Sequence, residues 1–164
     1  MSANPHASEF RVEKARSYAT LTLSNSETVL GCFFVSTSSP SLPGPERVGE
    51  LLNTTPGLFP FEIHSDGPPR TILINREQVF LVELAENEAR HDSGYDIAKR
   101  RMVAVRLANG QRIVGTVRVY RPEGSDRLSD WARQPDQFRY IELDHVTAIV
   151  NVAHVIDASE VPQQ

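Results

Sequence analysis

The sequence predicts an all-β protein built as two tandem copies of a small, strongly bent five-stranded barrel, each copy with a short helical insertion. Three observations support this fold class. Residues 21–31 recur 84 positions later at residues 105–115, with apolar residues, an Asn and a final Gly in matching places. Apolar residues alternate with polar ones in short segments, which is the period of a half-buried strand. Turn residues separate these segments at short intervals, as in small barrels and sandwiches.

Further blocks repeat in the same order. Residues 47–51 and 61–63 have counterparts 80 positions later, and residues 73–75 have a counterpart 76 positions later. Because the separation falls only where loops intervene, the pattern is typical of a duplicated unit with shortened loops. We divide the chain into a mobile amino-terminal arm at residues 1–16, a first repeat at 17–84, a charged linker at 85–101 that is expected to be a solvated loop or helix, and a second repeat at 102–160.

Each repeat is expected to hold five strands. The first two form a hairpin, because Asn25-Ser26 and Asn109-Gly110 supply turn residues that tolerate a positive φ. Gly31 and Gly115 interrupt the second strands and predict a sharp bend there. The expected strands are residues 18–23, 29–35, 59–63, 71–75 and 78–82 in the first repeat, and 102–107, 113–120, 139–143, 147–151 and 154–158 in the second.

The helical insertion lies between the second and third strands of each repeat. Val48, Leu51 and Leu52 stand three or four positions apart in the first repeat, as do Leu128 and Trp131 in the second. This spacing predicts one or two helical turns with these side chains on the buried face.

Composition places the chain among ordinary globular proteins. Its 164 residues are 40% hydrophobic and 23% charged, with a net charge of −4. The single cysteine excludes an internal disulfide, and residues 1–16 contain no apolar run of the signal-peptide kind. No stretch approaches the ~20 apolar residues that cross a bilayer. We expect a cytoplasmic protein without a membrane partner.

Signals for catalysis or metal binding are poor. Cys32 lies in an apolar strand and is expected to be a packed, inert thiol. Asp144 and His145 are neighbours, and we expect an acid in a loop beside a surface histidine. The five histidines form no paired ligand motif: His6, His64, His91, His145 and His154. The sequence therefore predicts no catalytic, cofactor-binding or metal-binding residues, and no enzyme.

Basic residues concentrate at the start of the second repeat. Residues 99–121 contain seven Lys and Arg and no Asp or Glu. Strand periodicity places Arg106, Arg112, Arg118 and Tyr120 on the outward face, which suits an acidic protein or nucleic acid. The alternative is neutralisation by nearby acids, which are Glu123, Asp126, Asp130 and Asp136.

A second charged pattern recurs in both repeats. Arg47 precedes Glu50 by three positions, and Arg127 precedes Asp130 by the same spacing. Residues three apart on a helix are neighbours, so each pair is expected to form an exposed ion pair. The alternative is a duplicated anion site in which the arginine serves a ligand.

The strand with Val105, Leu107, Asn109 and Gly110, the bent strand with Gly115, and the final block at 148–156 together resemble the Sm-like barrel. The resemblance covers roughly residues 18–83 and 102–158. It implies a bent five-stranded sheet, ring assembly through edge strands and, in many members, RNA binding. The helical insertion departs from that pattern, and Ala153 before His154 leaves only half of the Lys-His pair of the bacterial Sm-like RNA chaperones. The arrangement is also similar to a bacterial family of uncharacterised proteins, which implies no activity.

We therefore expect a non-enzymatic binding or assembly module with a protein partner. Open edge strands invite association, so the repeats are expected to pair within the chain as a pseudo-dimer, or the chain to form a homo-oligomer. The basic face would dock an acidic partner, with the first repeat as scaffold. The alternative is binding of RNA or single-stranded nucleic acid. The residues expected to contact either ligand are Arg106, Arg112, Arg118, Tyr120, Arg127 and His154.

Overall fold

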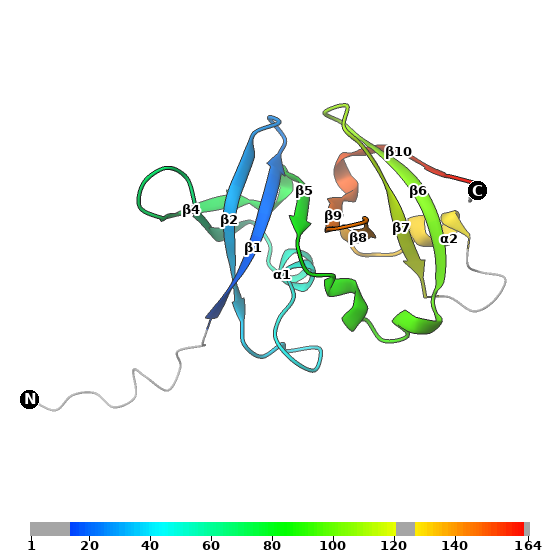
Figure 1. Cartoon of the computed structure of the whole chain (residues 1–164), viewed down its shortest axis with the longest axis horizontal. Coiled ribbons are helices and arrows are strands. Elements are labelled where there is room, and N and C mark those ends of the chain that lie inside the picture. Colours follow the sequence, from blue (N-terminus) through cyan, green and yellow to red (C-terminus); the bar gives the residue numbers. More distant parts are fainter. Residues whose placement is uncertain (1–13, 121–126, 163–164) are drawn as a thin grey trace, which may run out of the picture.

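The computed structural model describes residues 14–120 and 127–162 and confirms the all-β class (Figure 1). The first half contains β1 (Lys14–Leu23), β2 (Thr28–Ser36), α1 (Val48–Thr54), β3 (Leu58–Ile63), β4 (Arg70–Asn75), the 3₁₀ helix η2 (Arg76–Gln78) and β5 (Val79–Leu84). Two 3₁₀ helices follow, η3 (Glu88–His91) and η4 (Tyr95–Ile97). The second half contains β6 (Lys99–Leu107), β7 (Arg112–Val119), α2 (Leu128–Ala132), β8 (Phe138–Glu142), β9 (Thr147–Asn151), η5 (Val152–His154) and β10 (Val155–Glu160). Every predicted strand and both helical insertions are present, whereas positions 1–13 of the expected arm lie outside the described residues.

All ten strands belong to one antiparallel sheet. Its order is β10-β6-β7-β8-β9-β5-β1-β2-β3-β4. Within it, β1 to β5 are arranged as β5-β1-β2-β3-β4, and β6 to β10 take the same relative order. The sheet does not close on itself, because its two end strands, β10 and β4, each pair on one side only.

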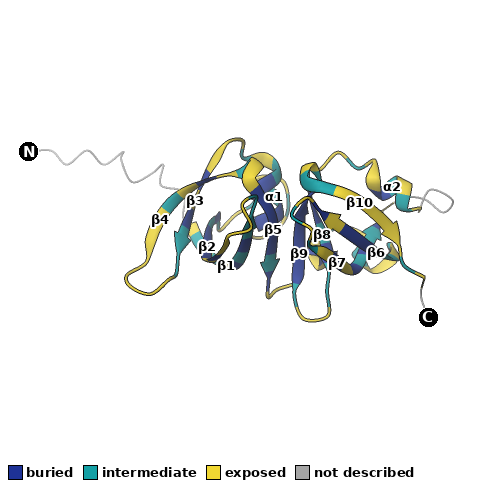
Figure 2. Cartoon of the chain, turned by 90° about the horizontal axis from the view of Figure 1, so that it is seen from above, coloured by how far each residue is buried: buried dark blue, intermediate teal, exposed yellow. Residues whose placement is uncertain are grey.

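The two halves meet where β5 pairs with β9. In this joint Val82 lies opposite Ile149 and Leu81 lies opposite Val150. The core of the first half includes Ile149 and Phe138 from the second half, and the core of the second half includes Leu81 from the first. Figure 2 shows β5 and β9 buried between the lobes, while β4 and β10 lie at the exposed outer sides. The joint is therefore continuous with both cores.

Gly31 and Gly115 allow neighbouring strands to approach closely. A Cβ atom on Gly31 would lie 1.8 Å from the carbonyl oxygen of Glu62, and one on Gly115 would lie 2.6 Å from that of Glu142. Gly31 lies opposite Ile63 in the β2-β3 pairing. Both glycines are thus required by the backbone of the next strand, at equivalent places in the two halves.

The segment between β5 and β6 is tied to both halves, not simply solvated as expected. The Glu88 carboxylate accepts hydrogen bonds from the backbone N–H of Val48 at 2.9 Å and of Gly49 at 3.3 Å, in the first turn of α1. The Tyr140 hydroxyl on β8 donates to the same carboxylate at 3.0 Å. Ala89 is buried beside these contacts. Burial raises the pKa of Glu88 despite these donors.

The helical insertions bury Val48, Leu51, Leu52 and Trp131 as predicted, and Leu128 is partly buried. The predicted ion pair within α1 is wrong. Glu50 accepts from the backbone N–H of Arg47, and the Arg47 guanidinium donates to Asp92 in the linker instead. The Glu50 carboxylate caps the start of its own helix and is therefore not paired with the Arg47 guanidinium. Across the residues described here, no helix is long and apolar enough to span a membrane.

Candidate functional site

The predicted basic face lies outward, but acids from other strands neutralise much of it. Arg106 on β6 pairs with Asp157 on β10, where Nε lies 3.0 Å from Oδ2. Arg101 on β6 pairs with Glu160, which is also on β10, at 3.5 Å. These acids were not among those expected, and the expected Asp130 instead accepts from the backbone N–H of Arg127 at 2.9 Å. Two of the other expected acids, Glu123 and Asp126, lie outside the described residues.

Arg118 is part of a partly buried polar cluster, so its charge is not available at a free surface. Its Nε lies 2.9 Å from Glu142 Oε2, and its guanidinium carbon lies 3.7 Å from the centre of the Tyr95 ring. The Tyr95 hydroxyl and the Asn87 amide donate to the same carboxylate. Although burial opposes it, these bonds hold the pKa of Glu142 below its ordinary value.

The other predicted contact residues are dispersed. The Tyr120 hydroxyl donates to Asp92 at 3.2 Å, at the side of the molecule where the linker runs. Arg127 is exposed immediately before α2. His154 lies at the joint, where its ring contacts Phe80 at 4.2 Å between centroids. The six predicted residues therefore do not form one continuous site.

A cleft of about 430 Å³ lies between the two helices, beneath the linker. Its charged lining includes Arg47, Arg118 and Glu142, all of which are already paired within the chain. Among the described residues no buried side-chain nitrogen or oxygen lacks a hydrogen-bond partner. The cleft therefore offers a ligand no buried polar side-chain atom that is unpaired among the described residues.

Two exposed leucines lie on β3 and on the end strand β4, in the half that the sequence analysis assigned to scaffold. Leu73 on β4 is 64% exposed, and Leu58 on β3 is 56% exposed. Their counterparts in the second half are Ile149 and Phe138, which are 0% and 2% exposed because the joint covers them. The internal repeat offered the signal, since Leu73 aligns with Ile149 and Leu58 with Phe138. The pairing of β5 with β9 is what distinguishes the two environments.

The opposite edge, β10, carries a different chemistry. Asp157 on β10 lies opposite Arg106 on β6, just as Leu81 on β5 lies opposite Thr22 on β1. A register shift precedes both pairs, so the two positions are structurally equivalent. Charged residues on an edge strand discourage pairing with another chain. Although Ile156 on β10 is also exposed, β10 carries Asp157 and Glu160, whereas the middle of β4 is Ile72-Leu73-Ile74.

A cluster on the outer face of the first half was also missed. Cys32 is buried as expected, but Glu62 and His64 lie beside its thiol, so the surroundings are not purely apolar. Glu62 and His64 are two positions apart on and after β3, and this spacing predicts a shared face. Cys32 comes close to Glu62 because β2 pairs with β3, although the α1 insertion separates the two strands in the sequence. Local sequence patterns do not predict this pairing. Burial raises the pKa of the Cys32 thiol.

Function is inferred from this geometry alone. Comparison of the chain with models of known protein families gives no match, and neither curated protein sequences nor solved structures give one.

Proposed function

We propose that the protein is a non-enzymatic protein-binding module that recruits an extended strand of a partner onto β4. The observation that carries this proposal is the contrast between Leu73, which is 64% exposed, and its counterpart Ile149, which is 0% exposed. The same position is covered by a strand in the second half and uncovered in the first. An open apolar edge supplies both main-chain hydrogen-bonding groups and side-chain contacts for β-augmentation.

The chain itself suggests the chemistry of the partner strand. The counterpart of β4 is β9, and β5 pairs with it antiparallel with Val82 opposite Ile149. A partner segment would therefore be extended, with an apolar side chain at the place of Val82 to cover Leu73. Leu58 would lie beneath the same segment, as Phe138 lies beneath the joint.

A second copy of the chain is a poorer occupant. In a head-to-tail assembly β10 would take the place of β5, and Asp157 would stand where Leu81 packs into the neighbouring core. Because β10 would still pair with β6, the Asp157–Arg106 ion pair would be desolvated there, which is ~1–4 kcal/mol less favourable than hydrophobic residues of similar size. We propose that pairing of the halves is intramolecular and that the free chain is a monomer.

We further propose that the halves are a tandem duplication of a Sm-like unit. Support comes from the shared strand order, from the matched glycines at Gly31 and Gly115, and from the matched register shifts before Leu81 and Asp157. In this view the last strand of the second unit in sheet order, β9, pairs with β5 inside the chain, and the equivalent strand of the first unit, β4, is left for a partner.

The test uses the chain's own β5 as a surrogate partner. A fluorescent peptide of residues 78–85, flanked by lysines for solubility, is titrated with the full-length protein and followed by anisotropy. Leu73 is 64% exposed, so covering the rest of its side chain contributes ~1–2 kcal/mol, and Leu73→Lys should weaken binding about 5- to 25-fold.

The matched control is Leu30→Lys. Leu30 is 57% exposed, but β2 is flanked by β1 and β3 and has no open edge. This variant should bind the peptide as the wild type does. Absence of binding to the wild type, or equal weakening by both variants, would contradict the proposal.

Nucleic-acid binding is the second candidate, supported by three cations without an acidic partner among the described residues: Lys99, Arg100 and Arg112. Filter binding to a mixed RNA pool at rising salt tests it, since neutralised phosphates give a steep loss of affinity with salt. Because Arg106 and Arg118 are already paired, we expect weak binding at low salt and a shallow salt dependence. A slope that requires more than about three phosphate contacts would favour this second candidate instead.

A further inference from the structure

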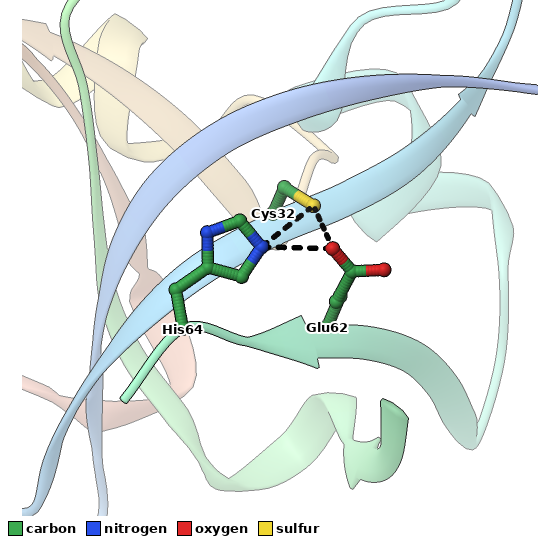
Figure 3. Close-up of side chains that lie close together, drawn as sticks. All are labelled: Cys32, Glu62 and His64. Atoms are coloured by element: carbon green, nitrogen blue, oxygen red, sulfur yellow. Dashed lines mark hydrogen bonds and ion pairs between the residues drawn. The ribbon is translucent and has the colours of Figure 1, made fainter. Parts of the chain in front are cut away.

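Three side chains that commonly ligate metals converge on the outer face of the first half (Figure 3). Cys32 Sγ lies 3.8 Å from Glu62 Oε1 and 3.9 Å from His64 Nε2. His64 Nε2 lies 2.8 Å from the same carboxylate oxygen. A thiol, a carboxylate and an imidazole thus present one donor atom each to a common point.

The sheet holds these donors in place. Cys32 on β2 lies directly opposite Glu62 on β3, and Tyr18 on β1 lies directly opposite Cys32. The Tyr18 ring meets the His64 ring edge-on, with centroids 5.5 Å apart. Arg16 donates to both oxygens of Glu62 at 3.3 Å and orients the carboxylate. Such outer contacts fix ligand orientation in metal sites.

The arrangement differs from a catalytic relay. In a relay of nucleophile, histidine and acid, the nucleophile and the acid contact different nitrogens of the imidazole ring. Here Cys32 Sγ and Glu62 Oε1 both approach Nε2 of His64, as the dashed lines in Figure 3 show. A single shared nitrogen cannot accept the thiol proton while donating to the carboxylate, whereas three donors around one point suit a cation.

The distances are close to those of tetrahedral zinc. Bond lengths of ~2.3 Å to sulfur and ~2.0–2.1 Å to nitrogen or oxygen place the ligand atoms roughly 3.3–3.6 Å apart. The separations of 3.8, 3.9 and 2.8 Å lie on either side of that range. Side-chain shifts of about half an ångström would therefore complete the geometry. His64 is one-third exposed at its side chain, so an ion has a route from solvent.

We propose that Cys32, Glu62 and His64 bind one zinc ion, with water in the fourth tetrahedral position. The thiolate and the carboxylate balance the charge of the ion, and the thiol proton is released to solvent on binding. Glu62 ligates through Oε1 and keeps Oε2 for Arg16. The ion stabilises the outer face of the first half by linking β2 to the end of β3.

Cobalt substitution of the full-length protein provides the first test. Cys32 is the only cysteine in the chain. A thiolate-to-cobalt charge-transfer band that appears on adding Co²⁺ to chelator-treated protein therefore reports ligation by this residue. The band should saturate at one equivalent of Co²⁺ and disappear on adding one equivalent of Zn²⁺. Absence of the band in the wild type would overturn the proposal, whatever the variants do.

Calorimetric titration of Zn²⁺ provides the second test. Cys32→Ser and His64→Ala should each weaken zinc binding by at least about 100-fold, because loss of a ligand exceeds the ~10–100-fold effect of an outer contact. His145→Ala is the control, since His145 lies in the exposed turn between β8 and β9. Thermal unfolding of each apo variant verifies that it folds. Unchanged zinc affinity in a folded His64→Ala variant would overturn the proposal.

Discussion

Replacing equivalent residues at the joint and at the open edge should have unequal effects on stability. Ile149→Ala removes the carbons of a fully buried side chain, and Leu73→Ala removes the same number from a side chain that is 64% exposed. Three carbons at ~0.8 kcal/mol each give about 2.4 kcal/mol of lost transfer free energy at Ile149, with a further cavity cost. Only about a third of that, ~0.9 kcal/mol, is at stake at Leu73, and solvent fills the space.

Urea unfolding of both variants measures the contrast. We expect the free energy of unfolding to fall by about 2.5–4 kcal/mol for Ile149→Ala and by less than about 1 kcal/mol for Leu73→Ala. Both variants should retain the m-value of the wild type. Equal losses would refute the reasoning, because they would mean that the side chain of Ile149 is no more buried than that of Leu73.

Three further predictions concern backbone contacts, buried acids and the β10 edge. Gly31→Ala should destabilise the fold more than Gly115→Ala in urea unfolding, because its Cβ would lie 1.8 Å from a carbonyl oxygen instead of 2.6 Å. The order would be reversed if β2 and β3 could separate freely. The pKa of Glu88 is raised, chiefly by burial, so its contribution to stability falls as pH rises through the glutamate range, and Glu88→Gln should remove that loss. Although burial opposes it, hydrogen bonding lowers the pKa of Glu142, so its contribution is lost as pH falls, and Glu142→Gln should flatten the acid limb; stability curves with the same change in slope for both variants would contradict these signs. Asp157→Leu restores the apolar residue found at the equivalent place on β5 and should produce concentration-dependent association in light scattering, whereas a strictly monomeric variant would show that charge does not protect this edge.

Local patterns predicted the secondary structure well because each element carries its own signal. The alternation along β6 and β7, and the Asn109-Gly110 turn between them, predict their antiparallel pairing, which is confirmed in register from Lys99 opposite Val119 to Arg106 opposite Arg112. The buried position of Trp131 follows from helical spacing in the same way. These features depend on residues close together in the chain.

The features that position the candidate sites depend on distant pairings. Asp157 reaches Arg106 only because β10 returns to pair with β6, and this ion pair balances one of the charges on the basic face. Cys32 meets Glu62 only because β3 follows α1 back to β2. Periodicity gives the face of each residue but not the strand beside it, so these contacts between distant strands could not be predicted from local charge and spacing.

The two halves share one strand order, but β9 is covered by β5 whereas the equivalent strand β4 is an open edge. This contrast indicates where a partner would bind. On β9 the apolar Ile149 is covered by β5, so selection for stability alone explains it. On β10 the position of Leu81 is occupied by Asp157, as expected of an edge that must remain soluble. Leu73 on β4 fits neither case, because it is apolar, exposed and on an open edge. A single exposed leucine needs no explanation. However, Leu73 occupies the place that a strand covers in the other half, and Leu58 beside it does the same. These two leucines, on β4 and on the neighbouring β3, are therefore the residues on which the proposed recruitment of a partner strand depends.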